Sequence, residues 1–162
     1  MWIALTDPTG SLFKPEGIGA GPNAPANSSS LVEVVVEDDR MVHADPLRLE
    51  QMVSNLLGNA IKYNKPGGHI DVSAPMLPNG SVQITVRDTG IGIPADKLPT
   101  IAEPFAQVIA DPHITSNGKG LGLAIVNSLA TAHSGRLAID SVLGEGTTVS
   151  VTFPPPDGPA KN

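Results

Sequence analysis

The sequence contains no cysteine, which excludes disulfides, thiolate metal sites and cysteine nucleophiles. Aromatic residues make up only 3% of it, so a hydrophobic core must be built from Val, Ile, Leu and Ala. It also lacks an apolar run near the roughly 18 residues that span a bilayer, and its start has no basic segment followed by an apolar stretch. We therefore expect a soluble, cytoplasmic chain without a signal peptide, which can still be one part of a membrane-anchored parent protein.

Positive charge is in the minority: the formal net charge is -6. A chain of this sign has no general electrostatic attraction for nucleic acid or anionic lipid. We therefore predict no nucleic-acid partner and no direct membrane contact. A small cationic site for a phosphate group is still allowed.

The 162 residues suit one domain with a single core. Residues 1–30 are rich in Pro, Gly and Ser and are predicted to form a linker or N-terminal arm, with a short edge strand near Trp2–Leu5 as the alternative. Residues 31–154 carry the patterned sequence of a folded domain. The Pro-rich segment 155–162 is predicted to be a disordered tail.

Hydrophobic periodicity predicts a mixture of helices and strands. The predicted strands are 31–36, 40–44, 69–74, 81–87, 136–140 and 147–153, and the predicted helices are 46–63, 94–102 and 121–133. Asp45-Pro46 is a good helix start, because Asp is a favoured N-cap and Pro suits the first helical position. We expect an α+β fold: a two-layer α/β sandwich in which helices cover one face of a mixed sheet.

The first helix carries a cluster of polar side chains beside its apolar stripe. Asn55, Asn59, Lys62 and Tyr63 lie three or four residues apart and so share one flank of the helix. Carboxamide oxygens suit a hard cation such as Mg²⁺, and an ammonium group suits phosphate. The flank is either a binding site at the edge of the core or a solvated helix face.

Arg87–Pro94 follows a strand directly. The ionised side chain of Asp88 offers only acceptors, and Gly90 and Gly92 allow a sharp turn against which a ligand can approach closely. Asp88 suits an exocyclic amine such as that of adenine, or else caps its own turn. Asp-Thr-Gly is also the aspartic protease signature, but that site needs a second matched carboxylate and a β-rich fold.

Three alternating glycines, Gly118, Gly120 and Gly122, open the last helix. Exposed amides at a helix N-terminus attract anions, so a polyphosphate suits this place. The segment is not a P-loop, because the Gly-Lys-Ser/Thr ending is missing, and its spacing is not that of a Rossmann turn. Phe105 is either the anchor of a lid or an ordinary core aromatic, and Gly144–Thr148 leads into the last strand.

In this order the clusters resemble the N, G1, F and G2 boxes of sensor histidine kinases. They are also similar to the wider GHKL superfamily, which includes DNA gyrase, the Hsp90 chaperones and MutL. The resemblance covers residues 31–154 and implies the Bergerat ATP-binding fold. Ala44-Asp45-Pro46 with Leu49-Glu50-Gln51, and Gly144-Glu145-Gly146-Thr147, are typical of the kinase branch.

The resemblance implies a role for each matching residue. Asn59 corresponds to the Mg²⁺ ligand and Asn55 to its companion; Lys62 would meet the phosphates, which makes Asn55 and Lys62 the catalytic candidates. Tyr63 would lie near the ribose or base, and Asp88 would bind the adenine amino group with the help of Thr147 through water. The other ATP-contacting or pocket-shaping positions are Gly90, Gly92, Ile93, Phe105, Lys119, Gly120, Leu121 and Gly122.

Some positions depart from the family pattern. Lys119 stands where the kinases usually have Thr or Ser, and no basic residue is evident in Thr115-Ser116-Asn117 before the G2 box. Asn55 stands where the ATPase branches usually have a water-activating glutamate, and an amide cannot act as that base. The resemblance therefore implies slow hydrolysis, with ATP held for transfer to a histidine.

The phosphate acceptor itself is missing. None of the histidines, which are His43, His69, His113 and His133, has the sequence context of a phosphorylated histidine. The leading hypothesis is a kinase catalytic domain that uses Mg-ATP, transfers phosphate to a histidine on a separate dimerisation domain, and so serves a response regulator. The alternatives are a degenerate nucleotide-sensing module that regulates a partner without transfer, and a GHKL ATPase.

Overall fold

The computed structural model describes residues 2–4, 31–35, 41–106 and 120–155, with side chains from residue 44 onward. Its elements are β1 (Trp2–Ala4), β2 (Leu31–Val35), β3 (Met41–His43), α1 (Pro46–Lys62), β4 (His69–Ser73), β5 (Val82–Asp88), α2 (Gly122–Ala132), β6 (Arg136–Val142) and β7 (Gly146–Phe153). No helix in these ranges has the length and apolarity that crossing a bilayer requires.

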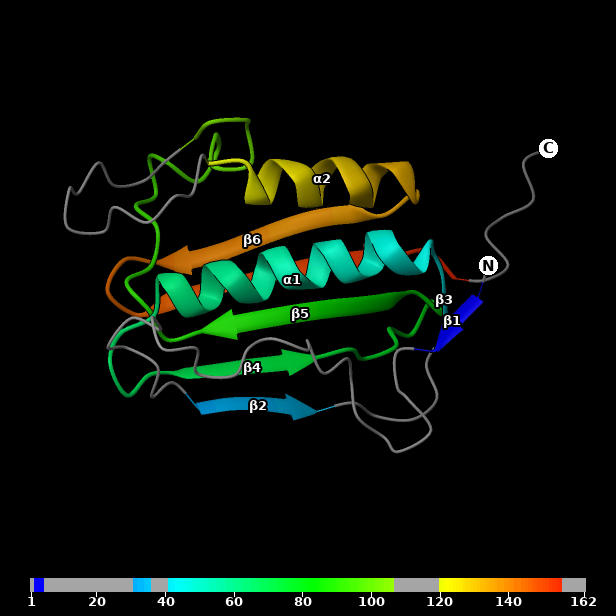
Figure 1. The fold of residues 1–162 in the computed structure, drawn as a ribbon, viewed down its shortest axis with the longest axis horizontal. Coiled ribbons are helices and arrows are strands. Elements are labelled where there is room, and N and C mark those ends of the chain that lie inside the picture. The colour runs from blue at the N-terminus through cyan, green and yellow to red at the C-terminus, as the bar shows by residue number, and fades with distance from the viewer. Residues whose placement is uncertain (1, 5–30, 36–40, 107–119, 156–162) are drawn as a thin grey trace.

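The main sheet has five strands in the order β2-β4-β5-β7-β6 (Figure 1). β2 runs parallel to β4, and the other neighbours are antiparallel. The sheet is therefore mixed, as predicted. Asp88 at the end of β5 pairs with Ile70 on one side and Thr147 on the other, which places it in the middle of the sheet rather than at an edge.

Both helices cover the same face of the sheet and run antiparallel to each other (Figure 1). The core between the layers is aliphatic apart from Phe153 and Met52, and its fully buried members include Ile70, Val126 and Val151. Burial alternates along β5, so Thr85 points to the opposite, polar face and bonds to Ser150 at 3.1 Å. The predicted two-layer α+β sandwich is confirmed.

The predicted start of α1 is also confirmed. The Asp45 side chain accepts a hydrogen bond from the Arg48 amide at 3.1 Å, and Pro46 occupies the first turn. The buried side of the helix consists of Leu49, Met52, Val53, Leu56, Leu57 and Ala60. This stripe fixes the rotation of α1, so the neighbouring polar flank cannot face the core.

One local prediction was wrong. Residues 94–102 form no helix but consecutive turns, in which Lys97 N–H donates to Pro94 and Thr100 N–H to Lys97. Pro99 has no N–H to donate within this segment, so a regular helical ladder is interrupted. After α2, Ser134 adopts a left-handed backbone with φ 57°.

The N-terminal segment is more ordered at one point than a linker would be. Trp2–Ala4 forms β1 and pairs antiparallel with β3, so the edge-strand alternative describes these residues. The rest of the predicted arm, 5–30, lies outside the described residues, as does 156–162 of the predicted tail.

Candidate functional site

A cavity of about 640 Å³ opens between α1, the end of β5 and the start of α2. We call it the α1 cavity. The predicted site residues that line it are Asn55, Asn59, Lys62, Tyr63, Asp88, Gly92, Ile93, Gly120, Leu121, Gly122 and Thr147. Four segments far apart in the sequence are thus brought to one place by the fold.

The polar flank of α1 forms one wall of this cavity. Asn55, Asn59, Lys62 and Tyr63 are all half-buried, so the alternative of a fully solvated helix face is wrong. The Lys62 ammonium lies 4.8 Å from the centre of the Tyr63 ring, within the range of a cation–π contact. This contact holds a positive charge at the cavity wall.

Asp88 is buried at the end of β5, and its carboxylate is held by the main chain. Its Oδ1 accepts hydrogen bonds from Gly90 N–H at 2.8 Å and Thr147 N–H at 3.3 Å. Burial raises the pKa of Asp88, and these two amides partly offset the rise. Since both bonds from described residues reach Oδ1, the second oxygen is available to accept from a ligand in the cavity.

Ser141 was missed by the sequence analysis. Its hydroxyl accepts from Ile93 N–H, donates to the Gly146 carbonyl, and lies 2.8 Å from Thr147 Oγ1. Because a serine hydroxyl has one proton, the Thr147 hydroxyl must be the donor in the last bond. Thr147 then presents only acceptor capacity to the cavity. A lone serine in a strand carries no sequence signal for this role.

Much of the remaining cavity lining is apolar. It includes Ile91, Ile101, Leu123, Ile125 and Val149, none of which the motif analysis singled out. Aliphatic residues in core-like patterns cannot be separated by sequence into those that face a core and those that face a cavity. A largely apolar lining with a few fixed polar groups is typical of small-molecule sites.

Two glycines are needed where the cavity wall turns sharply. Gly92 has φ 69° and lies against the Val142 carbonyl, and Gly120 has φ 67° and lies against the Ala106 carbonyl. A side chain at either position would combine backbone strain with a clash. Gly90 does not line the cavity, but a Cβ there would meet the Tyr63 carbonyl and Asp88 Oδ1.

The start of α2 faces the polar flank of α1. A Cβ on Gly122 would lie 3.4 Å from Asn59 Nδ2 and 3.8 Å from Asn55 Oδ1. Leu121 at the N-cap makes no side-chain hydrogen bond to the first turn, so among the described residues no N-cap side chain competes with an anion for the first amides of α2, which lie beside the two asparagines. Lys119 lies outside the described residues.

Phe105 is 72% exposed. The core-aromatic alternative is therefore wrong. Phe105 has φ 66°, and its N–H donates to the Gly120 carbonyl at 3.0 Å. This bond joins Phe105 to the residues just before α2.

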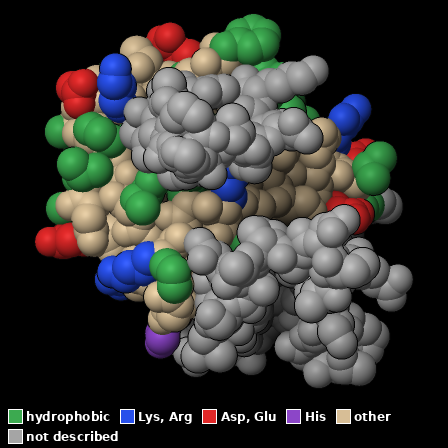
Figure 2. Space-filling model, turned by 60° about the vertical axis from the view of Figure 1, so that its left-hand side comes forward, with side chains coloured by type: hydrophobic (Ala, Val, Ile, Leu, Met, Phe, Trp, Pro, Cys, Tyr) green, Lys and Arg blue, Asp and Glu red, His purple; other side chains and the backbone are tan. Residues whose placement is uncertain are grey.

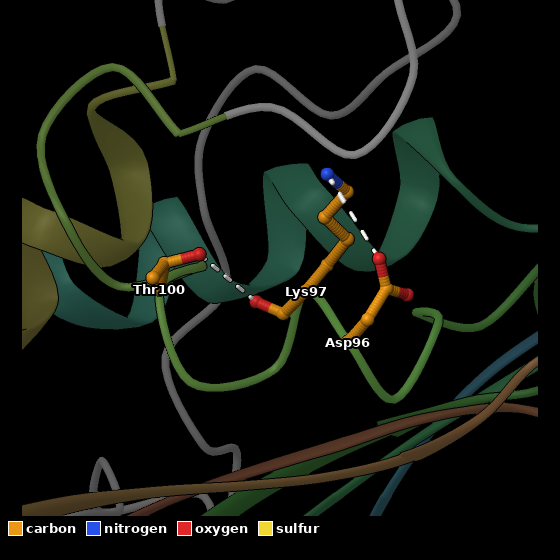
Figure 3. A network of polar contacts seen from close by, with 3 residues as sticks. All are labelled: Asp96, Lys97 and Thr100. Carbon is orange, nitrogen blue, oxygen red and sulfur yellow. Dashed lines mark hydrogen bonds and ion pairs between the residues drawn. The ribbon is translucent and has the colours of Figure 1, made fainter.

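The turns of 94–100 carry only weak side-chain contacts, shown in Figure 3. Lys97 Nζ lies 4.0 Å from Asp96 Oδ2 with both side chains exposed, and the Thr100 hydroxyl reaches the Lys97 carbonyl at 3.4 Å. Exposed pairs at this distance contribute little stability.

The donor set of the cavity fits a magnesium ion bound together with phosphates. Asn55 and Asn59 bring two carboxamide oxygens to the wall beside open helix amides. Mg²⁺ prefers oxygen ligands and is usually held by few protein groups plus substrate phosphates.

On the face drawn in Figure 2, acidic and basic side chains of the described residues are interspersed rather than gathered by sign.

Comparison with known proteins assigns this arrangement to a family. The family model described as histidine kinase-, DNA gyrase B-, and HSP90-like ATPase matches residues 44–157. The adaptive-response sensory kinase SasA of Synechococcus elongatus is 39% identical over 129 residues, which is 80% of this chain and 33% of SasA. The chain thus spans about a third of that kinase.

Solved structures agree with this assignment. The mycobacterial sensor histidine kinase MprB superimposes with a TM-score of 0.70 at 30% identity, covering 79% of this chain and 85% of that one. Full-length ShkA, solved in complex with AMPPNP, gives a TM-score of 0.65 at 31% identity, covering 77% of this chain and 25% of ShkA. The chain belongs to the histidine kinase-, DNA gyrase B- and HSP90-like ATPase family, as a catalytic domain of the sensor histidine kinase branch.

Proposed function

We propose that this domain binds Mg-ATP in the α1 cavity and transfers the γ-phosphoryl group to a histidine on a separate dimerisation domain, from which it passes to a response regulator. One observation carries the proposal: a single cavity joins the asparagine flank of α1, the strand-end Asp88 and the open amides of α2. The first suits a magnesium ion, the second an adenine amino group, and the third a phosphate chain.

The residues divide the work between the two ends of the nucleotide. Asp88 accepts a hydrogen bond from the adenine amino group, with Thr147 accepting through a bridging water. At the other end Lys62 neutralises phosphate charge, and Asn59, with Asn55 beside it, holds the metal ion. When bound, the magnesium ion draws charge from the phosphate oxygens. Phosphoryl transfer depends mainly on such positioning and charge neutralisation.

The transfer step needs a nucleophile from outside the described chain. A nitrogen of the acceptor imidazole attacks the γ-phosphorus, a phosphorus–nitrogen bond forms, and the bond to the leaving ADP oxygen breaks. Asn55 has no basic side-chain atom with which to activate water. Water therefore competes poorly with the histidine for the phosphoryl group.

Calorimetry with and without Mg²⁺ tests the binding half of this proposal, and mixing with a histidine-bearing helical domain and γ-labelled ATP tests the transfer half. We expect metal-dependent ATP binding, and label on the helical domain only when this chain is present. The matched variant Asn59→Ala should weaken metal-dependent binding more than metal-free binding. Binding without transfer to any supplied domain would instead support the nucleotide-sensing alternative.

A further inference from the structure

Asn64 follows α1 directly and is one of few buried polar residues in the described chain, with 6% of its surface exposed. It does not line the α1 cavity. Its neighbours are the main chain of His69 at the start of β4 and the side chain of Thr89 just after β5. We call these contacts the Asn64–Thr89 link, and they connect the ends of three elements.

Every polar atom of the Asn64 amide has a partner. Nδ2 donates to the His69 carbonyl at 3.2 Å, while Oδ1 accepts from Lys65 N–H at 3.0 Å and from the Thr89 hydroxyl at 3.4 Å. The His69 carbonyl can only accept and the Lys65 amide can only donate. The amide therefore has one orientation.

The Thr89 hydroxyl is fixed in the same way. It accepts from His69 N–H at 2.9 Å, so its own proton points to Asn64 Oδ1. Thr89 N–H also donates to the His69 carbonyl at 3.2 Å. Replacing the hydroxyl by a methyl group would remove both bonds: the one from His69 N–H is exposed to water, whereas the one to the buried Asn64 amide is part-buried and is the more costly to lose.

The link sets the place of the turn that orients Asp88. Ile91 N–H donates to the Tyr63 carbonyl at 3.0 Å, and Gly90 lies so close to that carbonyl that a Cβ would clash with it. Gly90 N–H in turn holds Asp88 Oδ1 at 2.8 Å. A shift of residues 89–91 away from α1 would therefore move the amide that aims the carboxylate.

We propose that Asn64 and Thr89 are positioning residues that set selectivity for adenine, because their link holds the Asp88 carboxylate in line with the base. The inference rests on the proposed function, in which Asp88 accepts from the adenine amino group. It adds that this selectivity depends on two residues outside the cavity.

The test compares ATP with inosine triphosphate, which carries a carbonyl in place of the amino group, by calorimetry well below the unfolding temperature. We expect Thr89→Val to lower the ATP-to-inosine-triphosphate affinity ratio about 3- to 10-fold, the range of one neutral hydrogen bond, with inosine triphosphate binding almost unchanged. Thr89→Ser keeps the hydroxyl and should keep the wild-type affinity ratio. Thr85→Val removes a threonine hydroxyl from β5 itself, where it bonds to Ser150 on the polar face of the sheet, and should leave the ratio unchanged.

Gly68→Ala gives a second route to the same effect, for the case that Thr89→Val does not fold. A Cβ on Gly68 would meet Asn64 Oδ1, so this variant displaces the amide without removing a polar group. It should lower the ratio in the same direction.

The outcomes separate the two proposals. A wild-type chain that binds ATP and inosine triphosphate equally, or binds neither, contradicts the role of Asp88 itself. The positioning role alone is overturned if the wild-type chain discriminates between the two nucleotides and a variant, Thr89→Val or Gly68→Ala, does so equally well. It is likewise overturned if such a variant loses affinity for both nucleotides in the same proportion.

Discussion

At the scale of single residues, Asp88 combines burial with a function that requires charge. Its carboxylate is held by the amides of Gly90 and Thr147, and burial raises its pKa. The domain thus keeps in its interior an acid whose ionisation does not favour the folded state. Such a group is typical of a binding site rather than of a stabilising contact.

We predict that Asp88→Asn lowers ATP affinity about 10- to 100-fold, because a hydrogen bond to a charged acceptor contributes roughly 1.5–3 kcal/mol. An asparagine can still accept from the two amides through its oxygen, but it presents a donor to the adenine amino group. Calorimetry measures the loss. Unchanged affinity would contradict the assignment of the base to this side of the cavity.

The same variant has a defined effect on stability. Because the pKa of Asp88 is raised above its ordinary value of 3.8, the folded state holds more protons than the unfolded state between these two pKa values, and the stability of the nucleotide-free domain falls as pH rises through that window. Asp88→Asn lacks this titration. Its unfolding temperature relative to wild type should rise from about pH 3.5 to neutral pH, and a fall in thermal-melt experiments would contradict the burial argument.

Ser134 has a left-handed backbone conformation that is unfavourable for a residue with a side chain. It follows α2 with φ 57°, and Gly135 N–H closes the helix end on the Ala130 carbonyl at 2.8 Å. Left-handed geometry costs an L-residue about 1–2 kcal/mol, partly offset because glycine loses more entropy on folding. We predict that Ser134→Gly stabilises the domain by about 0.5–1 kcal/mol, measured by urea unfolding. Ser134→Ala is the control and should give no gain.

At the scale of elements, a histidine joins the end of α2 to the start of α1. His133 Nδ1 lies 2.8 Å from the Leu129 carbonyl, and Nε2 accepts from Asp45 N–H at 3.2 Å. The carbonyl can only accept, so the proton lies on Nδ1 and the ring is neutral. The two antiparallel helices are thus tied where α2 ends and α1 begins (Figure 1). Gly122 approaches Asn59 at the other end of the helix pair.

We predict that His133→Ala destabilises the domain by about 1–2 kcal/mol, because it removes two hydrogen bonds and leaves the Asp45 amide without this partner. Chemical denaturation measures the change. His133→Asn keeps a polar side chain but is too short to reach both partners, so it should restore little. A loss within about 0.5 kcal/mol for both variants would show that the tie does not couple the helices.

At the scale of the whole molecule, the proposed function is one in which the domain holds ATP rather than hydrolysing it. Asn55 lies at the cavity wall without a basic atom, and the proposed transfer uses a histidine from another domain. We predict that the isolated chain forms ADP slowly, and that a supplied acceptor domain increases ADP formation only by accepting the phosphate. Following ADP by a coupled assay tests this, and fast turnover by the chain alone would support the ATPase alternative.

Periodicity and motif order predicted the two-layer fold, both helices and most strands, because each element buries one regular stripe of its own residues. The same reasoning failed where structure depends on contacts between segments. The 94–102 helix is replaced by turns, since Pro99 interrupts the ladder. The brief β1 pairing is confirmed only by its partner β3, which no local pattern could indicate.

The sequence alone determined which chemical groups are available: amides and an ammonium on one helix flank, a carboxylate at a strand end, and glycines where a ligand must approach. Tertiary structure alone decided how they are held. Ser141 sets the direction of the Thr147 proton, Asn64 and Thr89 fix the turn at Asp88, and five aliphatic residues become a cavity wall. These relations join residues far apart in the chain, and hydrogen-bond direction and burial depend on neighbours that folding supplies.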